Sequence, residues 1–365
     1  MTVRIDLEAT DGSARAGVVT TARGSFATPC FMPVGTRGTV RSLSSADLED
    51  LGAEVVLANT YHLMLRPGAA IVAGLGGLHD FMAWPGQVLT DSGGYQVFSL
   101  SPRVDDDGAV FRSTYDGSEH RLTPEGAVAV QEELGADIQM VLDVCPPWPA
   151  SVDVARAAVE RTAAWARRAK VAHHREGQAL FGIVQGGVSS MLRAESARRT
   201  VEIGFDGYGI GGLSVGEPRS EMLPALEAAL DHLPTGAPRY LMGVGDPVGL
   251  VEGVARGIDM FDCVLPTRLA RHGTLLTSTG KVKLRRAEFA VSDEPPDPGC
   301  ACPVCRRWSR GYLRHLLMVG EATGGRLCTM HNVWWTLQLM RDMRAAVVAG
   351  RFDAFRREIL ALWAD

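Results

Sequence analysis

The chain has 365 residues, of which 46% are hydrophobic and 22% are charged, and its formal net charge is −5. These proportions are those of an ordinary folded protein, so they exclude a chain that is mostly disordered. The negative total also argues against a protein that coats nucleic acid indiscriminately.

The chain alternates short apolar runs with longer segments of helical periodicity, a pattern that predicts βα units and a parallel sheet. Ser151 is expected to cap one helix, and Thr123-Pro-Glu-Gly is expected to open another with proline in its first turn. Eight runs are expected to be strands: residues 31–34, 54–58, 87–90, 138–142, 180–184, 207–210, 240–244 and 261–265. This count favours an α/β fold of the (β/α)8 TIM-barrel type, with an open doubly wound sheet as the alternative.

Polar residues and glycines at the ends of these runs favour the barrel over the open sheet. The residues at or just past the ends of different runs are Asp91, Asp143, Gln185, Gly211, Gly212 and Asp262. In a barrel the carboxyl ends of all the strands converge on one face, where catalytic residues from several strands meet. We therefore expect a catalytic barrel over residues 1–285.

The pattern changes after the eighth run. Residues 293–299, Asp-Glu-Pro-Pro-Asp-Pro-Gly, predict a stiff polar linker that leads into Cys300-Ala-Cys302-Pro-Val-Cys305. We expect a zinc-binding subdomain over residues 286–335, followed by a C-terminal helix over residues 336–365 that closes onto the barrel.

The cysteine cluster predicts a metal site. Three thiolates on one tight loop leave a tetrahedral ion one ligand short. His331 is the best candidate for the fourth ligand because the nearer His315 is expected in a helix, and Cys328 is the alternative. A closed site of three cysteines and one histidine would hold a structural zinc ion.

The compartment is predicted from the cysteines and the N-terminus. Seven cysteines, an odd number, with three of them in one cluster, suit a metal better than a disulfide framework. The first 17 residues contain acidic groups and have no apolar core, so we expect no signal peptide. No apolar run reaches membrane-spanning length. We expect a cytoplasmic protein.

Two aspartates predict chemistry at the anomeric carbon of a sugar. Asp91 lies at a strand end and is followed by two glycines, which let the backbone approach a ligand, and by Tyr95. Asp262 lies inside an apolar run, where an acid is costly unless it is used or paired. Paired carboxylates on one barrel face fit a nucleophile and a proton donor; the alternative is that each is hydrogen-bonded and structural.

Six motifs rich in glycine, aspartate or cysteine follow one another along nearly the whole chain. They are Asp-Ser-Gly-Gly-Tyr-Gln at 91–96, Phe-Gly-Ile-Val-Gln-Gly-Gly at 181–187, Gly-Ile-Gly-Gly-Leu-Ser-Val-Gly-Glu at 209–217, Tyr-Leu-Met-Gly-Val-Gly at 240–245, Phe-Asp-Cys-Val-Leu-Pro-Thr-Arg at 261–268, and the set Cys300, Cys302, Cys305 and His331. In these motifs the chain resembles the tRNA-guanine transglycosylases, also called queuine tRNA-ribosyltransferases.

The resemblance implies a role for each matching position. Asp262 is the expected nucleophile, which forms a covalent intermediate with the ribose of the wobble nucleotide and expels guanine. Asp91 is the expected general acid and base. Asp143 and Gln185 are expected to read the purine edge.

Further base contacts are implied by the same resemblance. The Gly212 N–H is a second donor to the base carbonyl, and the Leu213 carbonyl is placed for an exocyclic amine. Tyr95 and Met242 form the two faces of a stacking slot, with core packing as the alternative for Met242.

The resemblance also implies the substrates. Cys145 and Val215 match the bacterial choice at two pocket positions, so we expect an enzyme of queuosine biosynthesis that exchanges the wobble guanine of G-U-N anticodon tRNAs for 7-aminomethyl-7-deazaguanine (preQ1). His272, Trp148 and Cys328 depart from the usual residues, which affects the expected details of RNA contact.

Positive charge is concentrated near the C-terminal side of the expected barrel. Residues 263–314 include ten basic and four acidic residues, which fits a phosphate-binding stripe or a solvated surface. The residues expected to bind RNA are Arg268, Arg271, Lys281, Lys283, Arg285 and Arg286.

Trp308, Tyr312 and His315 match an aromatic cluster that bacterial relatives use in homodimerisation, which predicts a symmetric dimer. The alternative is that these side chains pack the small core of the insert.

Two other functions fit part of the pattern. A glycoside hydrolase would use paired carboxylates on a barrel but would act on free sugars. A non-catalytic RNA-binding module would use the metal-binding insert and the basic segment, and it would not need Asp262.

Overall fold

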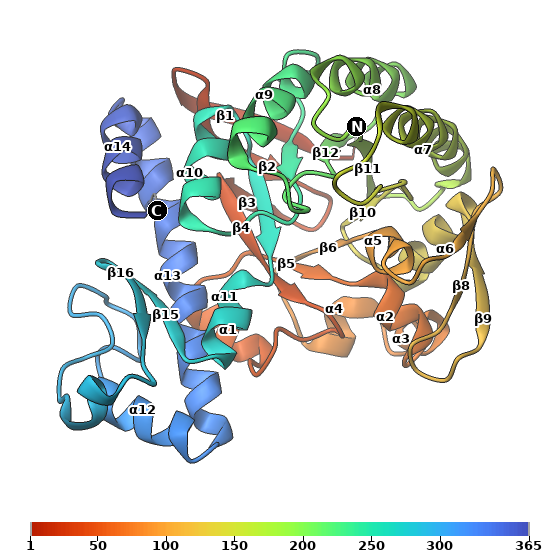
Figure 1. The fold of residues 1–365 in the computed structure, drawn as a ribbon. Helices are drawn as coiled ribbons and strands as arrows, with labels where there is room; N and C mark the ends of the chain where they lie inside the picture. Colours follow the sequence, from red (N-terminus) through yellow and green to blue (C-terminus); the bar gives the residue numbers. More distant parts are fainter. Residues whose placement is uncertain (1, 364–365) are drawn as a thin grey trace.

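The structure is a computed structural model that describes residues 2–363. Its centre is a closed barrel of eight parallel strands (Figure 1). In barrel order the strands are β10 (Ile138–Met140), β11 (Ala179–Val184), β12 (Gly207–Ile210), β13 (Arg239–Leu241), β14 (Met260–Cys263), β4 (Cys30–Gly35), β5 (Val55–Ala58) and β6 (Gln87–Thr90). Phe261 pairs with Phe31 and Ile138 pairs with Leu89 in the registers that close the barrel. The eight predicted strands and the barrel are confirmed, and the open sheet is excluded.

Helices connect the strands and cover the barrel. They are α1 (Ser45–Leu51), α2 (Thr60–Leu65), α3 (Ala69–Gly74), α4 (Gly77–Met82), α5 (Gly94–Phe98), α6 (Pro124–Leu134), α7 (Val152–Ala172), α8 (Ser190–Ile203), α9 (Arg219–Leu230), α10 (Pro247–Ala255) and α11 (Leu265–Arg271). The predicted helix starts are confirmed, since the Thr123 and Ser151 side chains accept hydrogen bonds from the backbone N–H groups of Gly126 and Val154.

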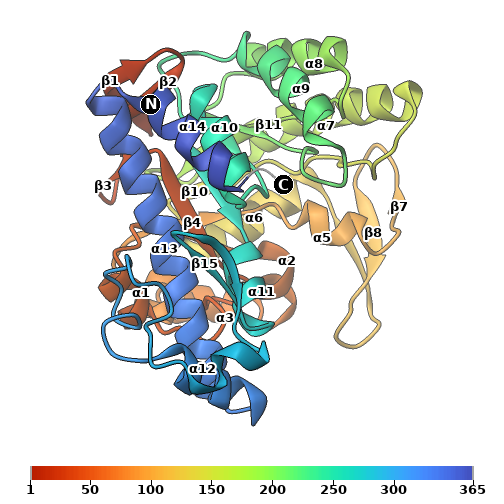
Figure 2. The same ribbon diagram turned by 60° about the vertical axis from the view of Figure 1, so that its left-hand side comes forward.

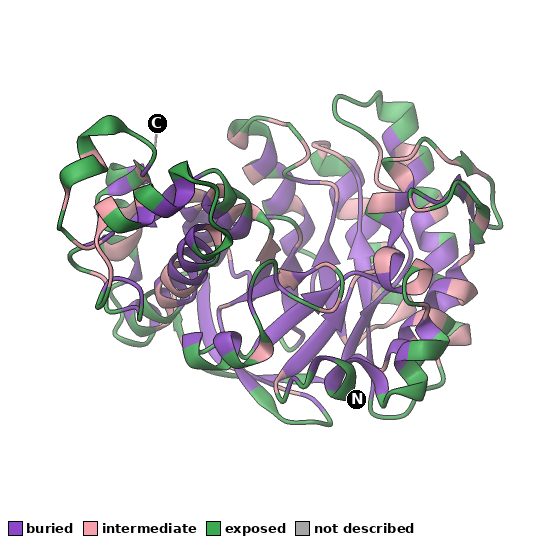
Figure 3. Ribbon diagram, turned by 90° about the horizontal axis from the view of Figure 1, so that it is seen from below, coloured by how far each residue is buried: buried purple, intermediate pink, exposed green. Residues whose placement is uncertain are grey.

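The barrel strands form the core. Every residue of β5, β6, β11 and β12 is buried, as expected for parallel strands with side chains packed on both faces. Figure 3 shows buried strands inside a ring of helices whose outer faces are exposed. The barrel is therefore a rigid frame for groups at its strand ends.

Three small antiparallel sheets lie outside the barrel, and the sequence analysis did not predict them. One contains β1 (Arg4–Asp11), β2 (Ala14–Thr20) and β3 (Ser25–Thr28), the second contains β7 (Arg103–Val104), β8 (Ala109–Arg112) and β9 (Glu119–Leu122), and the third pairs β15 (Thr274–Thr277) with β16 (Gly280–Lys283). Several of these strands are partly exposed, so they lack the continuous apolar runs that identified the barrel strands.

The C-terminal region follows β16 with a 3-10 helix, η1 (Ala287–Val291), and with α12 (Arg310–Met318), α13 (Ala322–Val348) and α14 (Phe352–Trp363). The expected boundary after residue 335 lies inside α13, so residues 336–363 form the end of one helix and the whole of another. No glycine or proline interrupts residues 326–349, and the helix ends just before Gly350, which has φ +63°.

Helix α13 joins the cysteine-containing region to the barrel. It packs against α11, α12 and β15, and also against β1, β2 and β4. Figures 1 and 2 show it running from α12 along the side of the barrel. Within residues 2–363, no helix combines the length and the apolar character needed to span a membrane.

Candidate active site and metal centre

A cavity of about 500 Å³ opens at the carboxyl ends of the barrel strands. Its volume suits a small molecule such as a heterocyclic base. The predicted residues that line it are Asp91, Tyr95, Asp143, Cys145, Gly212, Leu213, Val215, Met242, Asp262 and Arg268. The barrel thus brings together residues that are up to 177 positions apart in the chain, from Asp91 to Arg268.

Asp262 lies in β14 and is half-buried at the cavity. The Tyr240 hydroxyl and the Gly243 N–H donate hydrogen bonds of 2.6 Å and 2.8 Å to its Oδ1 atom. Burial raises the pKa of Asp262, and these two hydrogen bonds act in the opposite direction. Within residues 2–363, its Oδ2 atom accepts no hydrogen bond. One carboxylate oxygen is therefore fixed while the other is available to a ligand.

Asp91 lies one residue beyond β6, and both of its carboxylate oxygens accept hydrogen bonds. Its Oδ1 atom accepts hydrogen bonds from the N–H groups of Thr60 (2.9 Å) and Gly93 (3.0 Å), and its Oδ2 atom accepts one from the Asn59 amide (2.5 Å). Burial, with a smaller contribution from the negative charge of Asp262, raises the pKa of Asp91 to about 7 against these hydrogen bonds. A carboxyl group with that pKa can give and take a proton near neutral pH.

Asp143 and Gln185 form a buried polar pair beyond β10 and β11. Gln185 Nε2 donates a 2.6 Å hydrogen bond to Asp143 Oδ2. Burial raises the pKa of Asp143 to about 6. Gln185 does not line the cavity itself, but its Oε1 atom is buried with no hydrogen-bond partner in residues 2–363. Buried polar atoms are normally paired, so this pair is suited to a polar ligand that supplies the missing partners.

The other cavity walls are apolar or aromatic. Tyr95 on α5 is 60% exposed, and Met242, just beyond β13, is half-buried. Both line the cavity with Leu213, Cys145 and Val215. Because Met242 lines the cavity, packing in the protein core does not fully explain its position.

Three polar residues at the site were not predicted from the sequence. Asn59 and Thr60 directly follow the second predicted strand, so the strand-end rule that found Asp91 could have found them too. Tyr240 starts an apolar run, where a tyrosine reads as a core residue. Only the fold reveals that its hydroxyl meets Asp262.

The basic residues expected to bind RNA lie in two places. Arg268 on α11 lines the cavity, whereas the other five are exposed and do not line it. Lys281 and Lys283 are two residues apart on β16 and therefore share one face. Arg285 donates a hydrogen bond to the Leu317 carbonyl, and Arg286 forms an exposed ion pair.

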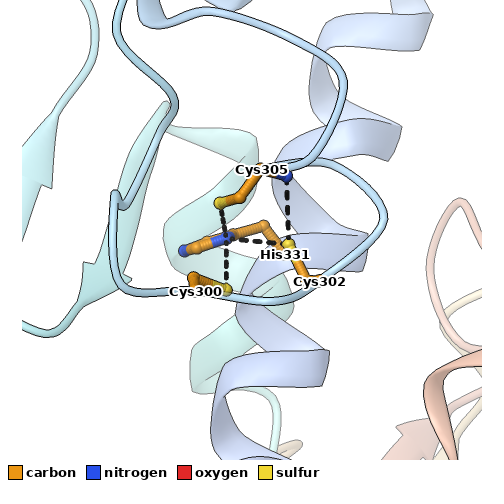
Figure 4. Close-up of side chains that lie close together, drawn as sticks. All are labelled: Cys300, Cys302, Cys305 and His331. Carbon is orange, nitrogen blue, oxygen red and sulfur yellow. Dashed lines mark hydrogen bonds between the residues drawn. The ribbon is translucent and has the colours of Figure 1, made fainter.

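Cys300, Cys302, Cys305 and His331 form the candidate metal centre (Figure 4). The three sulfur atoms lie 3.8, 3.4 and 3.3 Å from His331 Nδ1 in chain order. Ligands of a tetrahedral zinc ion are separated by roughly 3.5–3.8 Å, given bond lengths of about 2.0–2.3 Å. The donor set and its dimensions therefore fit one metal ion.

A hydrogen bond to the backbone fixes the orientation of the His331 ring. His331 lies on α13, and its Nε2 atom donates to the Leu276 carbonyl at 2.8 Å. This bond places the proton on Nε2 and leaves Nδ1 free to bind a metal, the usual arrangement around a ligating histidine. Cys328 lies on the same helix, is buried, and does not belong to the cluster.

The aromatic residues beyond the cysteines are partly accessible. Tyr312 is 44% exposed, His315 is exposed and Trp308 is half-buried. The first two therefore do not pack the core of the insert. A surface role remains the better interpretation for them.

Comparison with known proteins agrees with this geometry. Residues 10–365 match the family model described as "Queuine tRNA-ribosyltransferase". Proteins of that name from Symbiobacterium thermophilum and Desulforudis audaxviator are 53% and 54% identical, over 100% and 95% of this chain and 92% and 94% of their own lengths. A protein of the same name from Saccharophagus degradans is 52% identical over 97% of this chain and 95% of its own length. The chain therefore belongs to the queuine tRNA-ribosyltransferase family.

Proposed function

We propose that this protein is a tRNA-guanine transglycosylase that exchanges the wobble guanine of G-U-N anticodon tRNAs for preQ1 in queuosine biosynthesis. The main support is one observation: Asp91 and Asp262 line the same cavity, and both carboxylate oxygens of Asp91 but only one of Asp262 accept hydrogen bonds. Asp91 has a pKa of about 7, and Asp262 has one free carboxylate oxygen. A reaction with one proton carrier and one nucleophile needs such a pair.

In the first half of the proposed reaction, Asp262 Oδ2 attacks C1′ of the wobble ribose, and the bond from C1′ to the guanine nitrogen breaks. Protonated Asp91 gives its proton to the departing guanine. Tyr240 and Gly243 hold the other oxygen of Asp262 and so aim the attacking one. The product is an ester between Asp262 and the ribose.

In the second half, the ring nitrogen of preQ1 loses its proton to Asp91 and attacks C1′. The ester bond then breaks, and the Asp262 carboxylate is restored. Proton transfer by a positioned group is typically worth about 10² to 10⁴ in rate. At the end of the cycle Asp91 is protonated again and Asp262 is again a free carboxylate.

The proposed base-binding roles are supported by the presence of most of these residues in the cavity wall. Asp143 accepts from the ring and amino N–H groups of the base, and the Gly212 N–H donates to its carbonyl. Gln185 is the second proposed donor to that carbonyl, for which its Nε2 atom must leave Asp143 Oδ2. The Leu213 carbonyl accepts from the aminomethyl group. Tyr95 and Met242 stack on the two faces, while Cys145 and Val215 set the size of the pocket.

We assign zinc to the cysteine and histidine cluster, with a structural role. Four protein ligands leave no open coordination position, so the ion would fix the fold of the segment 286–335 and not take part in the reaction. This segment is too small to be held by a core of its own.

The proposed macromolecular partners are tRNA and a second copy of this chain. We propose that Arg268 and Arg271 contact nucleotides beside the target, and that the exposed side chains of Lys281, Lys283, Arg285 and Arg286 contact the backbone. Trp308, Tyr312 and His315 are the proposed dimer contact. The proposed compartment is the cytoplasm, where a tRNA substrate would be met.

The test is incorporation of labelled guanine into unmodified tRNA that has a G-U-N anticodon. The unmutated protein should transfer label to RNA, and Asp262→Ala should not. Release of free sugar from a glycoside, without labelling of RNA, would indicate a hydrolase. RNA binding that survives Asp262→Ala, with no exchange in either protein, would indicate a non-catalytic module.

A further inference from the structure

Arg193 is a buried arginine directly beneath the candidate active site. It lies on α8, has no solvent exposure, and forms no ion pair within residues 2–363. Its guanidinium group donates only to backbone carbonyls: Nε to Gly187 (2.7 Å), Nη1 to Val184 (3.0 Å) and Gly211 (2.7 Å), and Nη2 to Gly212 (3.0 Å). A charge buried without a carboxylate is costly, so its retention calls for an explanation.

The Val184 carbonyl ends β11, and the other three carbonyls, of Gly187, Gly211 and Gly212, belong to the loops that follow β11 and β12. Gly211 and Gly212 line the cavity. The peptide bond that joins them is trans and planar, so its C=O and N–H groups point in opposite directions. Because the carbonyl of this peptide faces Arg193 in the interior, the Gly212 N–H faces the cavity, and it has no acceptor within residues 2–363.

These loops contain glycines and are also ordered by a few other hydrogen bonds, such as those from the Gly211 N–H to the Val184 carbonyl (3.1 Å) and from the Val215 N–H to Glu217 Oε2 (2.9 Å). Gly212 has φ +65° and Gly186 has φ +139°, and glycine gives a backbone unusual freedom. A Cβ atom on Gly212 would lie 2.3 Å from Gln185 Oε1, so a stiffer residue does not fit there. Arg193 adds a link between the two loops, because it binds the Gly187 carbonyl in the first loop and the Gly211 and Gly212 carbonyls in the second.

The charge of Arg193 adds a second effect. Burial lowers its pKa only to about 10, so the group stays protonated at neutral pH. A charged donor on a peptide carbonyl polarises the peptide, and the N–H at its other end becomes a stronger donor. Arg193 itself does not reach the cavity.

We propose that Arg193 is a positioning residue that holds and polarises the Gly211–Gly212 peptide, so that its N–H binds the 6-oxo group of the purine base. The inference rests on the proposed function, since it assumes that the cavity binds guanine. The held peptide would then select bases that carry a 6-oxo group.

The test compares how tightly three free bases bind to full-length, metal-loaded protein, by calorimetry. Guanine has the 6-oxo group, 6-thioguanine carries sulfur, a weaker acceptor, in its place, and hypoxanthine keeps the oxygen but lacks the 2-amino group that Asp143 is proposed to read. We expect the unmutated protein to prefer guanine over 6-thioguanine by about tenfold or more, since one buried hydrogen bond is weakened. In Arg193→Gln this ratio should fall to about threefold or less, while the ratio of guanine to hypoxanthine stays within twofold.

Two further variants exclude a general loss of structure. Arg193→Lys keeps the charge but cannot reach all four carbonyls. Its ratio of guanine to 6-thioguanine affinity should therefore lie between those of the unmutated protein and Arg193→Gln. Arg239→Gln is the matched control, because Arg239 is also buried and donates to a backbone carbonyl, that of Leu233, but begins β13 at the far end of the barrel. Arg239→Gln should lose stability and keep both ratios.

The inference is overturned if Arg193→Gln, or Arg193→Lys should the former not fold, weakens the binding of all three bases by the same factor. A failure of the proposed function looks different. In that case the unmutated protein would incorporate no guanine into tRNA, whatever the base ratios are.

Discussion

The Tyr240 hydroxyl donates a 2.6 Å hydrogen bond to Asp262 Oδ1 across the neighbouring strands β13 and β14. Burial, with the charge of Asp262, raises the pKa of Tyr240 well above 10, so the phenol is protonated and able to donate at neutral pH. Tyr240 thus stabilises the ionised form of Asp262 that a nucleophile needs.

Tyr240→Phe should weaken catalysis without changing the cavity greatly. Loss of the donor raises the pKa of Asp262, so the low-pH limb of kcat/KM for tRNA should move to higher pH. A hydrogen bond to a charged group is worth roughly 1.5–3 kcal/mol, so kcat should fall by about tenfold or more. The check is a pH–rate profile of the variant beside the unmutated protein. An unchanged low-pH limb would mean that Tyr240 does not tune the nucleophile.

Asp91 should give the pH–rate profile its high-pH limb. Expulsion of guanine needs protonated Asp91, so single-turnover formation of the RNA adduct should slow as pH rises through about 7. The charge of Asp262 contributes to the raised pKa, so Asp262→Asn should lower the pKa of Asp91. Carbon NMR of labelled aspartate can follow that titration. A midpoint that stays near 7 in Asp262→Asn would show that the two carboxylates do not interact.

The same raised pKa affects stability in a defined direction. The folded-state pKa of Asp91, about 7, lies above the unfolded value near 3.8, so the folded protein binds the proton more tightly. The stabilising contribution of Asp91 is therefore complete below about pH 4 and is lost as pH rises through 7. Asp91→Asn should accordingly flatten the decline of unfolding free energy over that window, as measured by denaturant titration at several pH values.

Cys302→Ser should remove the metal and destabilise the C-terminal region. Elemental analysis should find about one zinc ion per unmutated chain and close to none in the variant, with a lower Tm. Cys328→Ser is the control, since Cys328 is buried on α13 outside the cluster. Equal loss of metal from both variants would contradict the assigned ligands.

Arg271→Ala should weaken the binding of tRNA but not of guanine. Each lost phosphate contact should reduce the slope of log affinity against log salt by about one. The control is Arg103→Ala, an exposed arginine on β7 outside the basic segment, which should leave the slope unchanged. An unchanged slope in Arg271→Ala would remove Arg271 from the RNA interface.

The sequence predicted the barrel because its parallel strands are buried on both faces and appear as apolar runs. Asp91, Asp143 and Asp262 could be found because acids at the ends of such runs are rare. The cysteine spacing predicted three ligands of a metal site, and His331, chosen over His315 and Cys328, does converge with them in a cluster that could hold one ion.

The remaining features depend on contacts between distant segments. Nothing in the local pattern around Tyr240 or Arg193 shows that the first meets a carboxylate and the second meets four carbonyls. The small sheets were not predicted because several of their strands are partly exposed and show no continuous apolar run. The continuity of α13 through residue 335 was missed because a domain boundary was placed where the helical pattern contains no breaker.

The central claim is that Asp262 bonds covalently to ribose during the exchange. The direct measurement is mass spectrometry of peptides from a reaction of protein and tRNA that has been trapped by denaturation without added base and digested with ribonuclease and protease. The account predicts a ribonucleotide attached to the peptide that contains Asp262, and its absence in Asp262→Asn. Attachment to another side chain, or no adduct from protein that exchanges guanine, would contradict it.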